Sequence, residues 1–500
     1  MSSHSLELTA DAPAPSSRAL FFSVFPSIML PMFLASVDGT IVAAALPAMA
    51  GALGEVERVS WVVVAYLVAA TIAAPVYGRL GDALGRRRMM FVALSVLLVA
   101  HVLCMLATSM TFLIAARVLQ GIGGGGLMTL SQALVGESVP PRERGRYQGY
   151  MASVFVCSST VGPVAGGWLT QHLGWRSVFS VGIPLAVLAI GLTFRLKKSP
   201  HGPGRLHFDF IGVVLFAAFI APMLMALEQV QRVNLASMPL AAGLLAVAAL
   251  ALVLLLRQER RAAAPLLPVA FLSQSAVWRT DAMAACMGAT LVATITFIPI
   301  YFIVARGTTP SEAGVLMLPL TALIAVGSMV TGRLISKTGR TAAIPSVGLP
   351  VVVVLITTLA FAAPYMSLSQ LPFLLGAIAL FCGTAMPVVQ VTVQMLAGAK
   401  QLGAAAASVQ FSRSIGAAVG TAIVGVVLFA TLAATDPETA HLFARLMEQG
   451  PAALAGLDAA RIAVVRHEIA DAFRSAFLSI AGFAALGAVL AWSLPVRRIT

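Results

Sequence analysis

The chain has 500 residues, of which 59% are hydrophobic and only 10% are charged, and its mean hydropathy is +0.95. An ordinary soluble protein carries about 25% charged residues, so this composition excludes a water-soluble enzyme and favours a protein that spans a bilayer. The net charge of +13 would suggest nucleic acid in a soluble protein, but here the basic residues stand in short loops between apolar runs, and we expect no nucleic-acid partner.

Fourteen apolar runs are long enough to cross the hydrocarbon, which takes about 20 residues. They fall at 21–49, 59–78, 89–107, 111–135, 147–170, 177–194, 209–230, 237–256, 277–304, 311–334, 343–363, 371–397, 403–433 and 474–494. The polar, partly acidic residues before the first run make a poor signal peptide. The sequence therefore predicts an all-α polytopic membrane protein with a retained N-terminal tail, 1–20.

The basic residues indicate the orientation of these helices. Most of the 32 Lys and Arg fall in the loops that lie on one side when both termini are placed in the cytoplasm. Cytoplasmic loops of membrane proteins carry such an excess of positive charge. We therefore expect an integral protein of the cytoplasmic (inner) membrane, with both termini cytoplasmic and with membrane lipids beside its loop arginines.

An internal repeat divides the chain. Gly78–Arg86 and Gly332–Arg340 share the frame G-R-L-x-x-x-x-G-R. The same offset relates two further pairs of glycines, Gly162 with Gly416 and Gly166 with Gly420. We expect two six-helix halves, 21–195 and 275–500, joined by two inserted helices with flanking loops, 196–274. Parallel halves of this kind enclose a substrate site near the midplane. An amphipathic helix lying on the membrane surface is expected in the outer loop, 434–473.

Four motifs follow one another on this frame. They are V-D-G-T-I-V-A-A-A-L-P from Val37, the loop from Gly78 to Arg88, R-V-L-Q-G from Arg117, and G-P-V-A-G-G from Gly162. Together they resemble the major facilitator superfamily and, more narrowly, its fourteen-helix drug:proton antiporter family. Three positions depart from that family. Val37 replaces a leucine and Ala43 replaces an asparagine in the first motif, and Ser158 replaces the leading glycine of the antiporter motif.

The resemblance implies a secondary active transporter that exports lipophilic or drug-like compounds from the cytoplasm in exchange for protons, by alternating access. The alternative is a proton-coupled transporter of one metabolite, such as a siderophore, amino acid or organic acid, on the same fold. No P-loop, H-E-x-x-H or G-x-S-x-G motif is present, so we expect neither an enzyme nor a cofactor or metal site. The partners expected are a small-molecule substrate and protons, and a periplasmic adaptor is left open.

Asp38 is the first candidate site residue. It lies in the middle of an apolar run, where a carboxylate costs roughly 2.5–3.5 kcal/mol. Such a group can bind and release protons during transport. Arg117 is its natural partner, because a guanidinium keeps its proton and must be paired or solvated. A static structural ion pair is the alternative interpretation. We expect His101 to be packed or partnered rather than catalytic.

The loop after the second span carries Gly78, Asp82, Gly85, Arg86 and Arg87. Glycine permits the tight turn. Asp82 can accept hydrogen bonds from loop amides or from a helix N-terminus of the neighbouring half. The arginines can meet lipid phosphates or acidic partners. The resemblance implies a conformational role for this loop, as a latch that favours the outward-facing state.

The fifth span contains Gly162, Pro163, Gly166 and Gly167, the antiporter motif of the resemblance. Small residues let helices approach closely and proline removes one backbone hydrogen bond, so a gate between the halves and plain tight packing are both open. Six other polar residues are candidates for the cavity: Thr40, Gln120, Gln390, Gln394, Gln410 and Arg413. Asp281 lies near a predicted span end, where an interface position explains it.

Overall fold

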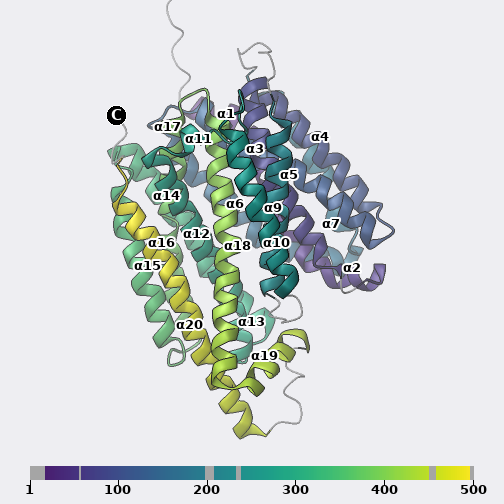
Figure 1. Cartoon of the computed structure of the whole chain (residues 1–500), viewed down its shortest axis with the longest axis vertical. Coiled ribbons are helices and arrows are strands. Elements are labelled where there is room, and N and C mark those ends of the chain that lie inside the picture. The colour runs from purple at the N-terminus through teal and green to yellow at the C-terminus, as the bar shows by residue number, and fades with distance from the viewer. Residues whose placement is uncertain (1–16, 56–57, 198–207, 232–237, 450–457, 496–500) are drawn as a thin grey trace, which may run out of the picture.

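The computed structural model describes residues 17–55, 58–197, 208–231, 238–449 and 458–495, and these residues are helical nearly throughout. Thirteen helical stretches of the described residues are long and apolar enough to cross a membrane. The remaining predicted span, 177–194, is built from two shorter helices. Helix α1 begins and α20 ends at the same end of the bundle (Figure 1), which we call the terminal end. An even number of crossings, such as fourteen, places both ends of the bundle on the same side. The prediction of an all-helical membrane protein is confirmed.

The first half runs from α1 to α8. Its helices are α1 (Ser17–Ile41), η1 (Val42–Ala45), α2 (Leu46–Leu53), α3 (Trp61–Leu84), α4 (Arg86–Met105), α5 (Met110–Ser138), α6 (Arg144–Leu173), α7 (Ser177–Ser180) and α8 (Gly182–Thr193). The first predicted span thus consists of α1, η1 and α2 in succession. Buried side chains of these helices form two apolar clusters of their own.

The second half runs from α11 to α20. Its helices are α11 (Val269–Leu272), α12 (Ser275–Ile300), η4 (Tyr301–Ala305), α13 (Pro310–Leu316), α14 (Leu318–Thr338), α15 (Ala343–Ala362), α16 (Leu371–Cys382), α17 (Ala385–Ala397), α18 (Leu402–Thr435), α19 (Pro437–Gln449) and α20 (Ala459–Trp492). One large apolar cluster joins them.

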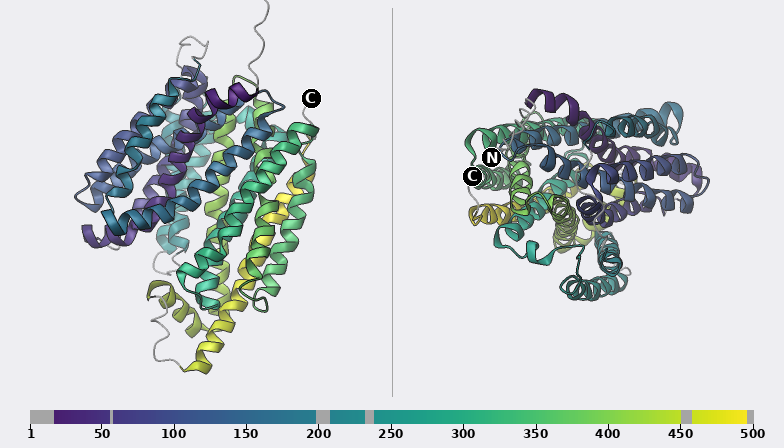
Figure 2. Two further views of the ribbon diagram at one scale, coloured as in Figure 1. Left: turned by 180° about the vertical axis from the view of Figure 1, so that it is seen from behind. Right: turned by 90° about the horizontal axis from the view of Figure 1, so that it is seen from above.

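Two inserted helices, α9 (Phe210–Gln231) and α10 (Met238–Glu259), pack against each other. α9 also contacts α3 of the first half and α18 of the second. Phe216 of α9 lies against Phe411 of α18 with ring centroids 5.3 Å apart. The pair therefore bridges the two halves along one side of the bundle (Figures 1 and 2).

The repeat in the sequence places a glycine with positive φ after the second long helix of each half. Gly85 follows α3 with φ 94°, and Gly339 follows α14 with φ 68°, backbone angles that favour glycine. Gly162 and Gly166 of α6 pack closely on α1, as Gly416 and Gly420 of α18 pack on α12. The glycines thus mark equivalent helix crossings, where a side chain would push the backbones apart.

The last predicted span begins earlier than the hydropathy suggests. α20 starts at Ala459, about four turns before 474. The prediction of a helix lying on the membrane surface is therefore wrong for 459–473, which continue the span. The reason is a buried stripe of Val465, Ile469 and Phe473, and Phe473 stacks edge-on against Phe443 of α19. Tertiary packing, not the membrane surface, takes up the apolar face of this amphipathic stretch.

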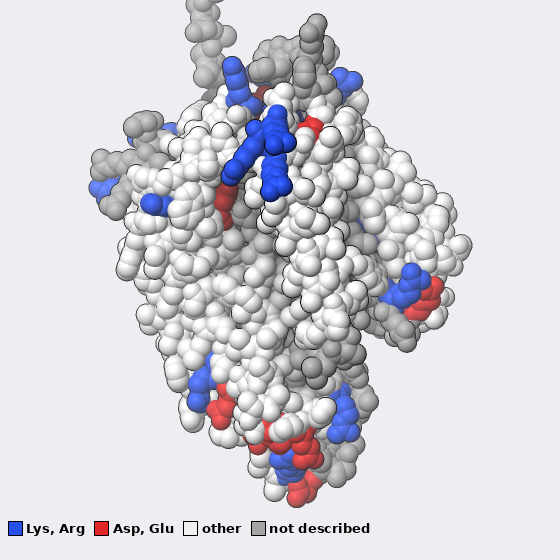
Figure 3. Space-filling view, in the orientation of Figure 1, with Lys and Arg blue, Asp and Glu red and all other residues white. Residues whose placement is uncertain are grey.

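In Figure 3, charged side chains gather at the top and bottom of the molecule and in one group at its right edge, and the surface between these groups is largely uncharged. Many large apolar side chains are exposed on the described helices, among them Val164, Phe210 and Phe373. An apolar surface this extensive fits contact with lipid rather than water. The helices of the two halves lie close together at the terminal end and diverge toward the opposite end (Figure 2).

Candidate functional site

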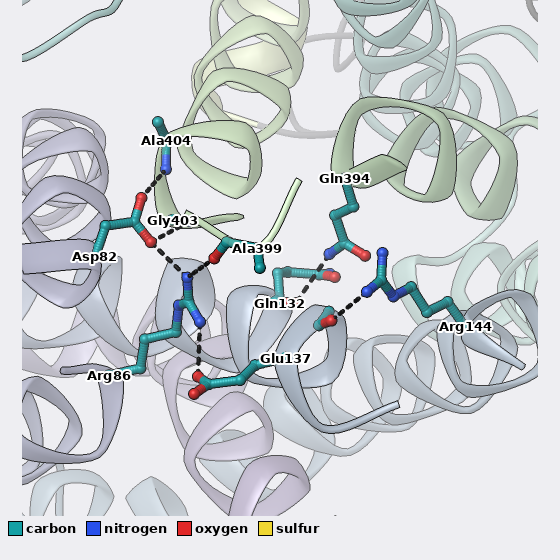
Figure 4. Close-up of polar contacts among 10 residues, drawn as sticks. Asp82, Arg86, Gln132, Glu137, Arg144, Gln394, Ala399, Gly403 and Ala404 are labelled. Carbon is teal, nitrogen blue, oxygen red and sulfur yellow. Dashed lines mark hydrogen bonds and ion pairs between the residues drawn. The ribbon is translucent and has the colours of Figure 1, made fainter. Parts of the chain in front are cut away.

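At the terminal end, Asp82 joins the two halves. Its Oδ1 accepts a hydrogen bond from the backbone N–H of Gly403 (2.9 Å) and its Oδ2 accepts one from Ala404 (3.1 Å). Both amides belong to the first turn of α18, where backbone N–H groups have no intrahelical partner and the helix dipole favours a negative charge. The expected contact between Asp82 and a helix N-terminus of the other half is present (Figure 4).

Arg86 reinforces this contact. Its Nη2 donates to Asp82 (2.6 Å) and to the carbonyl of Ala399 (3.3 Å), while its Nη1 meets Glu137 of α5 at 2.6 Å. The Arg86 side chain is 8% exposed. Arg87 points elsewhere and donates to the carbonyl of Thr193, at the end of α8. The sequence left lipid phosphates and acidic groups open as partners of these arginines. Arg86 contacts acidic side chains, whereas Arg87 contacts backbone carbonyls.

Glycines allow the backbones of the two halves to touch at the same place. A Cβ on residue 78 would lie 2.6 Å from the carbonyl oxygen of Gly403, and a Cβ on residue 145 would lie 2.8 Å from that of Gly332. Gln394 of α17 donates to the carbonyl of Gln132 in α5 (2.9 Å). Gln394, a candidate for the cavity, thus belongs to the closed interface at the terminal end. We call this interface the latch; it comprises Gly78, Asp82, Arg86, Gln394 and the start of α18.

A buried polar chain crosses the first half. Arg117 Nη1 donates to Gln120 Oε1 (2.7 Å), and Gln120 Nε2 lies 3.3 Å from His101 Nδ1. The other ring nitrogen, Nε2, lies 3.3 Å from Asp38 Oδ2. Asp38 is 3% exposed, and His101, Arg117 and Gln120 are fully buried. Four polar side chains from α1, α4 and α5 therefore form one line inside an apolar half.

The sequence pairs Asp38 with Arg117, and the structure corrects this. Arg117 donates through Nε to the carbonyl of Val62 (2.9 Å) and lies over the ring of Tyr66, 4.3 Å from its centroid. A carbonyl, an aromatic face and the Gln120 amide oxygen contact the guanidinium, while its Nη2 has no hydrogen-bond partner among the described residues. Asp38 faces His101 instead. The sequence signal for this pairing was the presence of a histidine in a span, which is rare and expensive.

Two of the four residues of the antiporter motif make close contacts. A Cβ at Gly162 would overlap Thr40 and one at Gly166 would overlap the Ile41 carbonyl, whereas nothing lies within 4 Å of a Cβ at Gly167. Pro163 is exposed. The hydroxyl of Thr40 bonds within α1 and reaches the Ser158 carbonyl at 3.4 Å. The glycine face thus packs against α1 of its own half, not against the second half.

The second half offers fewer polar contacts among its candidates. Arg413 donates to Gln410 (2.7 Å), and its guanidinium lies 5.4 Å from the ring centroid of Phe155 in the first half. Gln390 is 5% exposed, and its Nε2 has no hydrogen-bond partner in the described part of the chain. Asp281 is 8% exposed, and among the described residues it accepts a hydrogen bond from the Ser408 hydroxyl at 3.4 Å. An interface position therefore does not describe Asp281, which is buried among helices.

Comparison with known proteins gives the family of this chain. The family model of the Major Facilitator Superfamily matches residues 28–421. The chain belongs to this superfamily. This superfamily is one of membrane transporters, not of enzymes. Two solved structures share the fold: the human organic anion transporter TETRAN (TM-score 0.64, 16% identity, covering 96% of this chain and all of that one) and the proton:xylose symporter XylE (TM-score 0.61, 14% identity, covering 96% of each).

Relatives in sequence include transporters named for drug efflux. The chain is 29% identical to the multidrug transporter MdtP of Bacillus subtilis over 404 residues, 80% of this chain and 74% of that protein. It is 32% identical to an uncharacterized MFS-type transporter of Mycobacterium tuberculosis over 405 residues, again 80% of this chain. That match spans 58% of the mycobacterial protein, which is considerably longer.

Proposed function

We propose that this chain is a fourteen-helix drug:proton antiporter that exports lipophilic, drug-like compounds in exchange for protons. The terminal end, with its excess of basic residues, faces the cytoplasm. Similarity to relatives named multidrug transporters supports the substrate class. The buried Asp38 is the observation that supports proton coupling, because it is an ionisable carboxyl at membrane depth with no Lys or Arg as ion-pair partner among the described residues.

The closed latch corresponds to the outward-facing state. In this state Asp82 accepts hydrogen bonds from two backbone amides of α18, and Arg86 donates to the carbonyl of Ala399, which is also in the second half. These bonds hold the two halves together and close the cytoplasmic side. Asp38 takes up a proton from outside in this state. Opening of the latch exposes the central cavity to the cytoplasm, where the proton leaves and a substrate binds. An ionised carboxylate is costly in an apolar half, so protonation and conformation are linked.

Transport in vesicles tests this proposal. Purified protein is reconstituted, a pH gradient is imposed, and uptake of ethidium is followed by its fluorescence. Asp38→Asn, which keeps size and polarity but cannot ionise, is expected to lose gradient-driven accumulation while retaining dye exchange at equal pH. Asp281→Asn is the matched control, because it replaces a second buried carboxyl, in the other half, with the same amide.

Two outcomes contradict the proposal in different ways. Accumulation by Asp38→Asn at the level of the parent excludes Asp38 as the coupling group. A parent protein that moves no lipophilic dye, but moves a siderophore, an amino acid or an organic acid with protons, assigns the chain to the alternative function.

A further inference from the structure

The buried polar chain of the first half assigns a role to His101. This residue belongs to none of the four motifs, yet it is the side chain that faces Asp38. Its ring lies in a space that Gly182 of α8 leaves open, because a Cβ on that glycine would overlap the imidazole. The inference below rests on the proposed role of Asp38 in proton coupling and concerns how that carboxyl is held.

The order of donors and acceptors in the chain determines the state of the imidazole. Arg117 can only donate, so the Gln120 atom that faces it at 2.7 Å is the amide oxygen. The other end of the amide, an NH₂ group, then points at His101 Nδ1 (3.3 Å). An NH₂ donor requires an acceptor, so Nδ1 carries no proton. The bond made by one ring nitrogen decides where the proton of the other lies.

The proton of the neutral ring therefore lies on Nε2, which faces Asp38. Nε2 and Asp38 Oδ2 are 3.3 Å apart, at ion-pair distance but without the alignment of a full hydrogen bond. A doubly protonated ring would bring an Nδ1–H against the Gln120 NH₂ group, which is repulsive. The neutral ring with its proton on Nε2 is therefore the form that matches the amide orientation imposed by Arg117.

The other helices around the pair add few charged or ionisable groups. From α3, Tyr66 donates its hydroxyl to the Ala35 carbonyl (2.9 Å). From α4, the Cys104 thiol lies against Gln120 Oε1 (3.5 Å). α5 contributes Arg117, and α6 presents Ser158 and Gly162 to α1. α7 and α8 contain no ionisable residue. Asp38 and Arg117 are therefore the charged groups of the cluster, and His101 and Gln120 stand between them.

We propose that Arg117, acting through Gln120, holds His101 as a neutral imidazole with its Nε2–H toward Asp38. His101 is then a positioning residue that stabilises the ionised carboxylate and carries no transported proton itself. Arg117 and Asp38 make no direct ion pair; they are linked by the hydrogen bonds from Arg117 to Gln120 and from Gln120 to His101 and by the contact between His101 Nε2 and Asp38. Each transport cycle then uses one carboxyl in this half, with no second proton on the imidazole.

Two substitutions separate a neutral donor from a proton carrier. His101→Gln places an amide NH₂ near the position of Nε2 but cannot become charged in the transport range, while His101→Leu removes the donor. Infrared spectroscopy of purified protein follows the protonated carboxyl band that is absent from Asp38→Asn. We expect the midpoint pH of this band to rise by about one to two pH units in His101→Leu, as expected for loss of a hydrogen bond to an ionised group. In His101→Gln it stays close to the parent value.

Nitrogen-15 NMR of histidine-labelled protein tests the ring directly, with the His101 signals identified by their loss in His101→Gln. The expected spectrum shows an unprotonated Nδ1 and a protonated Nε2, and Gln120→Leu mixes the two tautomers. A protonated Nδ1 in the parent, or a midpoint in His101→Gln that moves as far as in His101→Leu, overturns the inference. These readouts need no substrate, so they stand apart from the vesicle experiment, whose failure would count against the proposed function alone.

Discussion

Replacing Gly78 with alanine is expected to open the latch. Gly78 lies in α3, and the nearest atoms to a Cβ at that position belong to α18 of the other half: the carbonyl oxygen of Gly403 at 2.6 Å and the Cβ of Ala407 at 3.1 Å. The contact is reciprocal, because a Cβ on Gly403 would overlap the Gly78 carbonyl. A backbone carbonyl inside a helix cannot turn away as a side chain can, so the halves must separate.

The size of the effect follows from the cost of overpacking, about 1–3 kcal/mol for an added methyl in a well-packed contact. This cost falls on the closed state only, since residue 78 faces no neighbour of the other half once the latch opens. The higher helix propensity of alanine is the same in both states and cancels. The ratio of open to closed molecules is therefore expected to rise about 5- to 150-fold.

Spin labels at Arg142 and Lys337 measure the opening. Both positions are exposed and lie at the terminal end, one in each half. The background carries Cys157→Ser, because Cys157 is the exposed cysteine whereas the other three are buried. Double electron–electron resonance is expected to show a second, longer distance in Gly78→Ala.

Gly81→Ala is the matched control, three residues further along α3. A Cβ there would meet the terminal methyl of Leu130 at 2.8 Å, the end of a side chain of the same half rather than a backbone atom of the other half. This variant should keep the distance distribution of the parent. The reasoning fails if a folded Gly78→Ala protein stays closed, or if Gly81→Ala opens equally.

Two further predictions concern other parts of the molecule. Gly166→Ala should lower the stability of the protein by about 1–3 kcal/mol in thermal unfolding, because its Cβ would overlap the Ile41 carbonyl, whereas the neighbouring Gly167→Ala should not; equal losses would show that the glycine contact with α1 is not the cause. At the opposite end, a hydrogen bond from Arg461 lowers the pKa of Asp436 from 3.8 to about 2. A carboxyl whose pKa is lower in the folded than in the unfolded chain stabilises the fold at pH values above its unfolded pKa. That contribution is lost as the pH falls from about 4 toward 2. Hydrogen-exchange protection of α19 should therefore weaken as the pH falls through this range. In Arg461→Gln the protection should not change with pH over the same range. If the variant loses protection as the parent does, the bond between Arg461 and Asp436 is not the cause.

Much of the fold could be predicted because its signals are local. Hydropathy identifies each span from consecutive residues, and the offset between Gly78 and Gly332 reveals the two halves. The start of α20 was misjudged because Arg461 and Arg466 interrupt an apolar pattern, although Val465 and Phe473 are buried by a neighbouring helix. A window of hydropathy treats such a stretch as solvent-exposed, since it has no information on what lies opposite.

For the candidate site too, part could be predicted from the sequence and part could not. The sequence by itself determined that Asp38, Arg117 and Asp82 are unusual, because an ionisable group in or beside an apolar run has a free-energy cost that can be assessed without a structure. Only the tertiary structure decided their partners. Asp38 faces His101 rather than Arg117, and Arg86 binds Glu137. Gly162 packs against α1 of its own half rather than against a helix of the second half. The physical reason is that each partner lies on another helix, and which helix faces converge depends on the packing of the whole bundle.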